Sequence, residues 1–254
     1  MTPAVPTPLQ ARSERFGQML IAARRRLDKE TVHQLRVSIR RLQAALRLMG
    51  QDEERRALRP LMQLAGAVRN CDVALELAHE AGLAPDHAVC DGLRRTRRQQ
   101  AAALKLAVAA FAPPSFHEDA IQPQRSVLED FFRAGRRALR HPREKRLHAL
   151  RLAGKRLRYT IELLAPALDS STPERLRELK HVQDALGQIN DCASARLLTE
   201  DEGFHAWLAA EQERQGERFE EYWRRCFGVL GARESWKLFL RPALPAKSAS
   251  TPAT

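Results

Sequence analysis

Apolar residues recur along this chain at the three- and four-residue spacing of an α-helix. One such stripe runs from Val32 to Met49, and a second runs from Leu147 to Leu164 with Gly154 as its one gap. Each stripe is typical of a helix that buries one face in a bundle. No stretch of five or more residues alternates apolar and polar positions with β-branched enrichment, as a half-buried strand would. The pattern therefore predicts an all-α protein.

Helix-breaking residues divide the chain into segments. The periodic runs are interrupted at Gly50, Gly82, Pro113–Pro114, Pro123, Pro142, Pro166 and Gly203. Residues 112–123 hold three prolines and little periodicity, so they form the best domain boundary. Ser126 with Glu129, and Ser171 with Glu174, resemble helix capping boxes. We expect a flexible N-terminus over residues 1–10, a first helical-bundle repeat over 11–112, a linker over 113–123, a second repeat over 124–240 and a flexible tail over 241–254.

The two sides of this boundary carry matching segments. In each half a histidine opens a row of basic residues at the same spacing: His33, Arg36, Arg40 and Arg41 in the first, and His148, Arg151, Lys155 and Arg156 in the second. Downstream, each half has a basic residue, then a glycine, then two polar residues: Arg59, Gly66, Arg69 and Asn70 in the first, and Lys180, Gly187, Asn190 and Asp191 in the second. This internal repeat predicts a duplicated helical bundle.

The chain is strongly basic. It has 43 Lys and Arg against 31 Asp and Glu, which gives a formal charge of +12. Apolar residues make up 44% of the chain, which excludes a disordered protein. The longest uncharged apolar stretch, residues 106–112, is far shorter than the roughly 20 residues that span a bilayer. The excess positive charge indicates a polyanionic partner, which could be a nucleic acid, a phosphate polymer or an anionic membrane.

Most of these repeated basic residues fall on one face of each predicted helix. With a rotation of about 100° per residue around the helix axis, the residues of each row fall within an arc of about 80° that lies beside the apolar stripe. The first row is His33, Arg36, Arg40, Gln43 and Arg47, and the second is His148, Arg151, Lys155, Arg158 and Glu162. No acidic residue occurs within residues 31–51 or 145–161 to relieve the repulsion. A solvated charged face would explain one such helix. Two matched helices favour an anion site in a groove, because each basic row borders a buried stripe.

The sequence contains no recognisable catalytic or metal-binding motif. There is no Gly-rich phosphate loop, no GxSxG and no paired-carboxylate motif, and neither repeated histidine has a second ligand four residues later. We therefore expect no metal and no cofactor. The cysteines form no CxxC pair, and we expect them to be small buried hydrophobic residues: Cys71, Cys90, Cys192 and Cys226. Four polar residues are expected to follow helix breaks, as caps or as partners of the basic side chains: Asn70, Asp72, Asn190 and Asp191.

The two histidine segments resemble the signature helices of the CHAD family, the conserved histidine α-helical domain. The segments at Gly66–Val73 and Leu186–Asp191 resemble the later pair of motifs in that family, and the likeness covers residues 11–240. The resemblance implies two pseudo-symmetric tandem four-helix bundles around a basic central cleft. It also implies non-enzymatic binding of inorganic polyphosphate and association with polyphosphate granules.

Position by position, the resemblance implies that nine residues line the cleft: His33, Arg36, Arg40, Arg41, His148, Arg151, Lys155, Arg156 and Arg158. Helical geometry adds Arg47 to the first row, and the third helix of each half adds Arg59 and Lys180 as further candidates. The family usually has a basic residue where Gln43 stands, so the first row is expected to be the weaker one. Six residues are expected to hold these side chains in place: Arg69, Asn70, Asp72, Tyr159, Asn190 and Asp191.

Two alternative functions follow from the same residues. A nucleic-acid binder would use the same charge, but aromatic residues are only 6% of the chain and do not interleave with the basic rows, which disfavours base stacking. A phosphohydrolase or phosphotransferase would use His33 or His148. The first residues lack the basic and apolar regions of a signal peptide, so we expect a cytoplasmic, granule-associated protein with no membrane partner.

Overall fold

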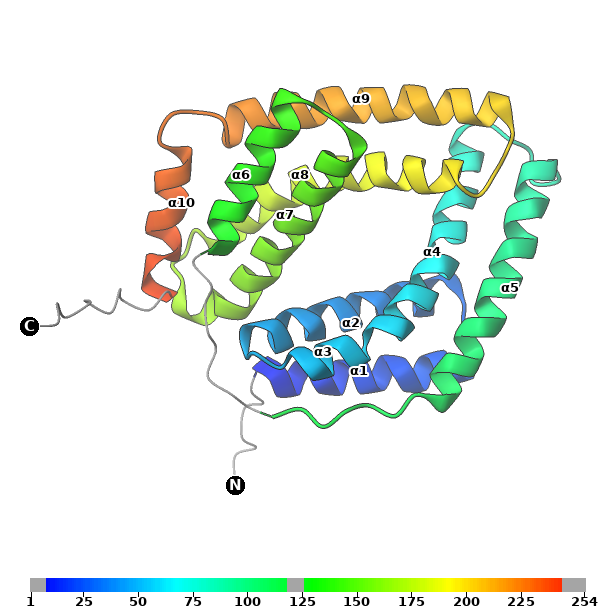
Figure 1. Cartoon of the computed structure of the whole chain (residues 1–254), viewed down its shortest axis with the longest axis horizontal. Coiled ribbons are helices and arrows are strands. Elements are labelled where there is room, and N and C mark those ends of the chain that lie inside the picture. Colours follow the sequence, from blue (N-terminus) through cyan, green and yellow to red (C-terminus); the bar gives the residue numbers. More distant parts are fainter. Residues whose placement is uncertain (1–7, 118–125, 244–254) are drawn as a thin grey trace, which may run out of the picture.

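The computed structural model of this protein describes residues 8–117 and 126–243. Every regular element in these two ranges is helical, which confirms the all-α prediction. Along the chain (Figure 1) the elements are α1 (Pro8–Arg25), α2 (Lys29–Leu48), α3 (Asp52–Ala57), α4 (Arg59–Glu80), α5 (Ala88–Ala110), α6 (Ser126–Arg140), α7 (Glu144–Leu164), the 3₁₀ helix η1 (Ala165–Ala167), α8 (Thr172–Arg196), α9 (Glu202–Cys226), α10 (Ala232–Leu240) and the 3₁₀ helix η2 (Arg241–Ala243).

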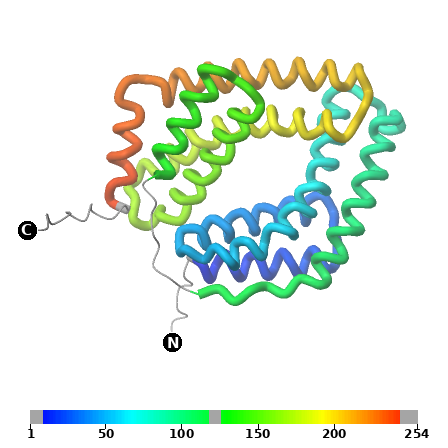
Figure 2. Tube along the Cα trace, in the orientation of Figure 1, coloured from blue at the N-terminus to red at the C-terminus, as the bar shows by residue number. Residues whose placement is uncertain are grey.

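Helices of the two halves pack in the same order. In the first half α1 packs on α2, α2 on α4 and α4 on α5, and in the second α6 packs on α7, α7 on α8 and α8 on α9. The trace shows α4 with α5, and α8 with α9, as two long helix pairs whose far ends meet in one corner (Figure 2). Contacts of α4 with α8 and of α2 with α7 join the halves. The two-fold pseudo-symmetry of the bundles stays a prediction.

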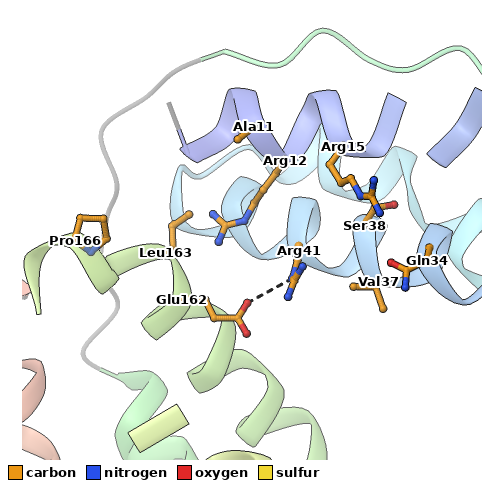
Figure 3. Close-up of a pocket in the computed structure, with 10 residues that line it drawn as sticks. All are labelled: Ala11, Arg12, Arg15, Gln34, Val37, Ser38, Arg41, Glu162, Leu163 and Pro166. Atoms are coloured by element: carbon orange, nitrogen blue, oxygen red, sulfur yellow. Dashed lines mark ion pairs between the residues drawn. The ribbon is translucent and has the colours of Figure 1, made fainter. Parts of the chain in front are cut away.

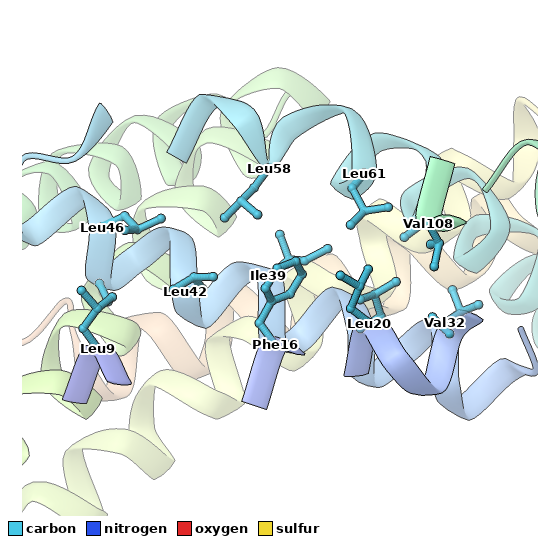
Figure 4. Packing of buried hydrophobic residues seen from close by; sticks show 14 of the residues in the cluster. Leu9, Phe16, Leu20, Val32, Ile39, Leu42, Leu46, Leu58, Leu61 and Val108 are labelled. Atoms are coloured by element: carbon cyan, nitrogen blue, oxygen red, sulfur yellow. The ribbon is translucent and has the colours of Figure 1, made fainter. Parts of the chain in front are cut away.

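Three hydrophobic cores hold this arrangement together. The first core lies among α1, α2, α4 and α5, and it buries the predicted stripe from Val32 to Met49 (Figure 4). The second lies among α6 to α10 and buries Leu150, Leu157 and Ile161 of the second stripe. The third lies at the corner where the long pairs meet, with α4, α5, α8 and α9 all contributing. Because the third core is shared, it fixes one half of the molecule against the other.

Helix ends agree with the predicted breaks at several positions. Asp28 caps α2, since its Oδ1 accepts a hydrogen bond from the Thr31 amide at 2.8 Å. Gly50 and Gly82 follow α2 and α4 with φ of 73° and 81°, a left-handed conformation that suits glycine after a helix. Pro166 lies in η1, directly after α7.

Other predicted helix signals were wrong. Ser171 stands before α8, but its hydroxyl donates to Asp169 Oδ1 at 2.5 Å and makes no capping bond. Gly203 lies inside the first turn of α9, because Asp201 starts that helix by accepting from the Phe204 amide at 2.7 Å. A capping side chain therefore decides the boundary there, and the glycine does not.

The predicted domain boundaries are only partly covered by the structure. Residues 113–117 of the predicted linker are non-helical, while residues 118–123 lie outside the described residues. The same holds for residues 1–7 and 244–254, which include most of the predicted terminal segments. The prediction that the cysteines are buried is confirmed for Cys71, Cys90 and Cys192, and Cys226 is half-buried. No helix within 8–117 or 126–243 is long and apolar enough to cross a membrane.

Two glycines inside helices, Gly135 and Gly187, differ in how closely their surroundings are packed, so replacing each with Ala tests the packing of the second core. A Cβ atom placed on Gly135 would lie 1.9 Å from Cζ2 of Trp223, whose side chain is only 1% exposed. The ring has no room to move, so we expect Gly135→Ala to lower the free energy of unfolding by about 1–3 kcal/mol. Gly187 lies inside α8 with nothing within 4 Å of its added Cβ. We expect Gly187→Ala to raise the free energy of unfolding by about 0.5–1 kcal/mol, because alanine favours a helix more than glycine does. Urea titration measures both variants, and equal changes in unfolding free energy for the two would contradict the packing argument.

Candidate anion-binding pocket

A pocket of about 810 Å³ lies between α2 and α7, with residues of α3, α4 and α6 along its sides. We call it the central pocket. Its basic lining residues come from both halves of the chain: Arg40, Arg47, Arg55, Arg59, His148, Arg151, Lys155 and Arg156. The other lining residues are neutral: Gln43, Ala44, Leu48, Met62, Gln63, Val127, Leu152, Tyr159 and Thr160. No Asp or Glu lines the central pocket in the described part of the chain.

The packing of α2 against α7 determines which side chains reach the central pocket. Leu42 of α2 and Leu157 of α7 are fully buried, and they fix the rotation of the two helices. Arg40 and Lys155 stand beside these apolar stripes and therefore face the space between the helices. A pocket lined by charges of one sign focuses the electric field and attracts counter-ions.

The cations between α2 and α7 repel one another. Burial, followed by the charges of Arg40, Arg151 and Arg36, lowers the pKa of Lys155 from its ordinary value of 10.5 to about 6. Burial is also the main cause that lowers the pKa of Arg36 and of Arg151. Asp191 of α8 is the carboxylate that offsets part of this effect for Arg36, Arg151 and Lys155 alike. The pocket therefore carries a surplus of positive charge before any ligand binds.

Unused hydrogen-bond donors accompany this charge. Nε of Arg151 is buried and has no hydrogen-bond partner among the described residues. Arg36 is half-buried and does not line the pocket, and its Nη1 donates to the Ala65 carbonyl at a long 3.4 Å. Buried donors without a partner are rare in folded proteins, so a ligand with acceptor oxygens would satisfy them.

Ion pairing separates the predicted basic residues into two groups. Within residues 8–117 and 126–243, six cations that line the central pocket make no salt bridge: Arg40, Arg47, Arg59, Arg151, Lys155 and Arg156. Arg55 is the exception in the lining, since its Nη2 lies 2.7 Å from Asp52 Oδ1. A guanidinium without a carboxylate partner keeps its full charge for a ligand, and Lys155 gains its charge when anionic oxygens beside it raise its lowered pKa.

The predicted residues Arg41, Arg158 and Lys180 lie outside the central pocket. Arg41 comes directly after Arg40, which lines the pocket, and a rotation of about 100° around the axis of α2 turns it to another side of that helix. Glu162 attracts both arginines, with its Oε2 3.5 Å from Nε of Arg41 and its Oε1 2.9 Å from Nε of Arg158. Lys180 is exposed on α8 and pairs with Asp184 at 2.5 Å. Their placement corrects the expectation that they line the same cleft.

The two repeated histidines occupy different positions. His148 lines the central pocket, is exposed, and its Nδ1 lies 3.0 Å from Oδ1 of Asn190 on α8. Asn190 thus orients the imidazole ring, as expected for a residue that holds a basic side chain in place. His33 is half-buried and does not line the pocket. Burial and then the charge of Arg69 lower the pKa of His33, which favours its neutral form.

A family model describes the region that contains these features. The CHAD domain model matches residues 10–200 of the chain. The chain belongs to the CHAD domain family. This confirms the resemblance found in the paired histidine segments. No curated protein matches the chain.

Two solved structures share the fold of this CHAD domain. PptA from Streptomyces chartreusis aligns with a TM-score of 0.54 and 16% identity, over 92% of this chain and 100% of that chain. The crystal structure of the CHAD domain from the plant Ricinus communis aligns with a TM-score of 0.52 and 22% identity, over 94% of this chain and 90% of that chain. At these identities the likeness concerns the fold alone.

The later pair of CHAD motifs lies inside helices and not at their ends. The prediction that four polar residues act as caps was wrong, because they lie in the interior of α4 and α8: Asn70, Asp72, Asn190 and Asp191. Gly66 lies within α4 without interrupting it. A Cβ atom at Gly66 would be 3.2 Å from Nη1 of Arg36, so the glycine leaves room for that side chain. Its role is close packing beneath the basic row.

Four other residues were expected to position the basic row, and two of them form ion pairs elsewhere. Arg69 pairs with Glu76 at 2.9 Å, and Asp72 pairs with Arg97 of α5 at 2.6 Å. The second pair links α4 to α5 and does not contact the central pocket. Asn70 is exposed, and Tyr159 lines the pocket itself.

Sequence reasoning missed Arg55. This residue lies on α3, and the side-chain Nε2 of Gln43 on α2 donates to the backbone carbonyl of Arg55 at 3.3 Å. Gln43, which stands where the CHAD family usually has a basic residue, thus helps to hold a different arginine at the pocket. The acidic run before Arg55 makes it look like part of a solvated face, so no local pattern could have identified it.

Proposed function

We propose that this CHAD domain binds inorganic polyphosphate in the central pocket without cleaving or transferring it. The observation that carries the proposal is that six described cations share one pocket and lack carboxylate partners, whereas Arg41, Arg158 and Lys180 outside it are ion-paired. Unpaired like charges at close range destabilise the free protein, and a polyanion removes that cost. A phosphate chain suits the pocket because it has a charge on every unit and no bulky substituent. The resemblance to the CHAD family implies the same ligand.

Each type of side chain has a distinct role in this proposal. Arginines such as Arg40 and Arg151 donate two hydrogen bonds to paired non-bridging oxygens of phosphate. Lys155 supplies a point charge between them once phosphate oxygens have raised its lowered pKa. The neutral ring of His148 has its one proton on Nδ1, toward Oδ1 of Asn190, so the ring donates from Nε2 to phosphate as the imidazolium. In cells, we propose that this binding attaches the protein to polyphosphate granules in the cytoplasm.

Nucleic acid is the weaker candidate for the same pocket. Tyr159 and the imidazole of His148 are the only rings among the described residues that line it, with no Phe or Trp, so bases would find little to stack on. A flexible phosphate chain can enter a pocket of about 810 Å³, whereas a duplex presents its phosphates on a wide, stiff surface.

Phosphate chemistry at His148 is the other alternative. No carboxylate lines the central pocket among the described residues, so none is present there to act as a general base beside His148. His148 is oriented by an amide, which does not stabilise an imidazolium as a carboxylate would. Release of phosphate by the purified protein, lost in His148→Ala, would support this alternative and contradict the binding proposal.

Competition between polyanions tests the proposal directly. In a filter-binding assay in moderate salt, we expect unlabelled long-chain polyphosphate to displace labelled polyphosphate far better than duplex DNA does at equal phosphate concentration. Six neutralised phosphates predict a slope of about −4 for log affinity against log salt, by analogy with single-stranded nucleic acids. Equal competition by duplex DNA would show that the site is a general polyanion surface and would contradict the proposal.

A further inference from the structure

A second pocket lies on another side of α2, where α1 and the end of α7 approach it. Its volume is about 560 Å³, and it shares no lining residue with the central pocket. Figure 3 shows Arg12 and Arg15 extending from α1 and Arg41 extending from α2, with Glu162 of α7 at one side. The other lining residues are Ala11, Gln34, Val37, Ser38, Leu163 and Pro166. We call this the outer pocket.

Positive charge in the outer pocket exceeds the negative charge available to it. Glu162 is its only described carboxylate, and one oxygen of Glu162 already accepts a 2.9 Å hydrogen bond from Arg158, which lies outside the pocket. The other oxygen lies 3.5 Å from Nε of Arg41, which is a loose contact. Three arginines therefore share one carboxylate that is largely engaged elsewhere.

Arg12 has an unsatisfied donor in this pocket. Its Nη1 is buried and has no hydrogen-bond partner among the described residues. Burial is the main cause that lowers the pKa of Arg12, with the charge of Arg41 adding to it and that of Glu162 opposing it. Arg15 is exposed, and its Nη1 makes a long 3.5 Å hydrogen bond to Oε1 of Gln18 and no salt bridge among the described residues. Two of the three guanidinium groups are therefore available to a ligand.

We infer that the outer pocket is a second anion site, which binds a compact phosphoryl anion through Arg12, Arg15 and Arg41. Forked guanidinium donors match the paired oxygens of a phosphoryl group, and several arginines supply the charge that such an anion needs. The volume lies within the range of small-molecule sites. The anion has two sources of the same chemistry, which are free pyrophosphate or inorganic phosphate and the terminal phosphoryl group of a polyphosphate chain. The inference does not depend on the proposed function of the central pocket.

The test uses pyrophosphate as the probe and a background in which the central pocket is disabled. In the full chain carrying Arg40→Gln, Arg151→Gln and Lys155→Gln, we expect isothermal titration calorimetry to detect one remaining pyrophosphate site. Adding Arg12→Gln or Arg15→Gln should weaken that site about tenfold for each guanidinium removed. Adding Glu162→Gln instead should tighten it several-fold, because the competing carboxylate is gone. Arg98→Gln, an exposed position outside both pockets, is the matched control and should leave affinity unchanged.

The outcomes separate the two proposals. Unchanged pyrophosphate affinity in Arg12→Gln and Arg15→Gln, or no site in the disabled background, would overturn the outer pocket and leave the central pocket untouched. Because Arg12→Gln removes a buried, unpaired charge, we expect its melting temperature to hold or rise, so a loss of binding would not reflect unfolding. Competition against pyrophosphate by polyphosphate chains with free ends and with blocked ends then distinguishes the sources. If chains with free ends displace pyrophosphate and chains with blocked ends do not, the occupant is a chain end. If neither kind of chain displaces pyrophosphate, the occupant is a free anion.

Discussion

Replacing Arg40, Arg151 and Lys155 with Glu is expected to reduce polyphosphate affinity by at least about a thousandfold. Each of these side chains lines the central pocket and has no carboxylate partner among the described residues. A charge-assisted hydrogen bond contributes about 1.5–3 kcal/mol, so three lost contacts exceed a thousandfold even before the reversed charges repel the ligand. Filter binding measures the affinity, and circular dichroism should show unchanged helicity, because none of the three residues belongs to a hydrophobic core.

A control with the same change in net charge makes this result specific. Arg98, Arg140 and Lys180 are exposed and line neither pocket. Their combined replacement by Glu alters the net charge of the protein by the same amount. We expect this control to weaken binding only slightly, through the long-range field that salt screens. If the control lost as much affinity as the pocket variant, the overall charge of the chain would explain binding, and the central pocket would have no special role.

The affinity for polyphosphate is expected to rise as the pH falls from about 8 to about 6, by up to tenfold per pH unit. In the free protein the pKa of Lys155 is lowered to about 6, by burial and by Arg40 and Arg36 of α2 and Arg151 of α7, with Asp191 of α8 opposing them. Phosphate oxygens beside the amine would raise that pKa again, so binding should take up about one proton in this pH range. Calorimetry in buffers of different ionisation enthalpy counts that proton.

The Lys155→Met variant isolates the proton that belongs to this residue. It should remove the extra proton uptake and flatten the pH dependence, while any protons taken up by the ligand itself remain. Stability of the free protein should change in the opposite direction with pH. Between pH 6 and pH 10.5 the unfolded chain binds a proton at Lys155 and the folded chain does not, so the free energy of unfolding rises with pH across that range. If the affinity of Lys155→Met and its free energy of unfolding changed with pH as steeply as those of the unaltered protein, this account would be contradicted.

The sequence predicted the helices, their buried faces and the existence of two matched basic rows. Those features depend on spacing along one helix, which is about 100° per residue whatever the surroundings. Val32, Leu42 and Leu157 are buried where the periodicity placed them. Arg40, Arg151 and Lys155, which the spacing placed on the two basic rows, line one pocket.

Predictions that depended on partners in other helices were less accurate. Arg41 lies about 100° from Arg40 around α2 and faces the outer pocket, where helix packing places Glu162 of α7 beside it. Arg55 reached the central pocket because α3 packs there through Gln43. The partners that other helices supply, Glu162 for Arg41 and Gln43 for Arg55, leave no signal in the local pattern of residues.

By itself, the sequence determined that this chain is an all-helical CHAD domain with a surplus of positive charge arranged in two rows. The tertiary structure alone decided which of those charges remain unpaired. A charge is available to a ligand only if no carboxylate lies within a few ångströms, and the carboxylates that matter here, such as Glu162 for Arg41 and Arg158, come close through helix packing. Coulombic interaction depends on distance in space, which separation along the chain does not reveal.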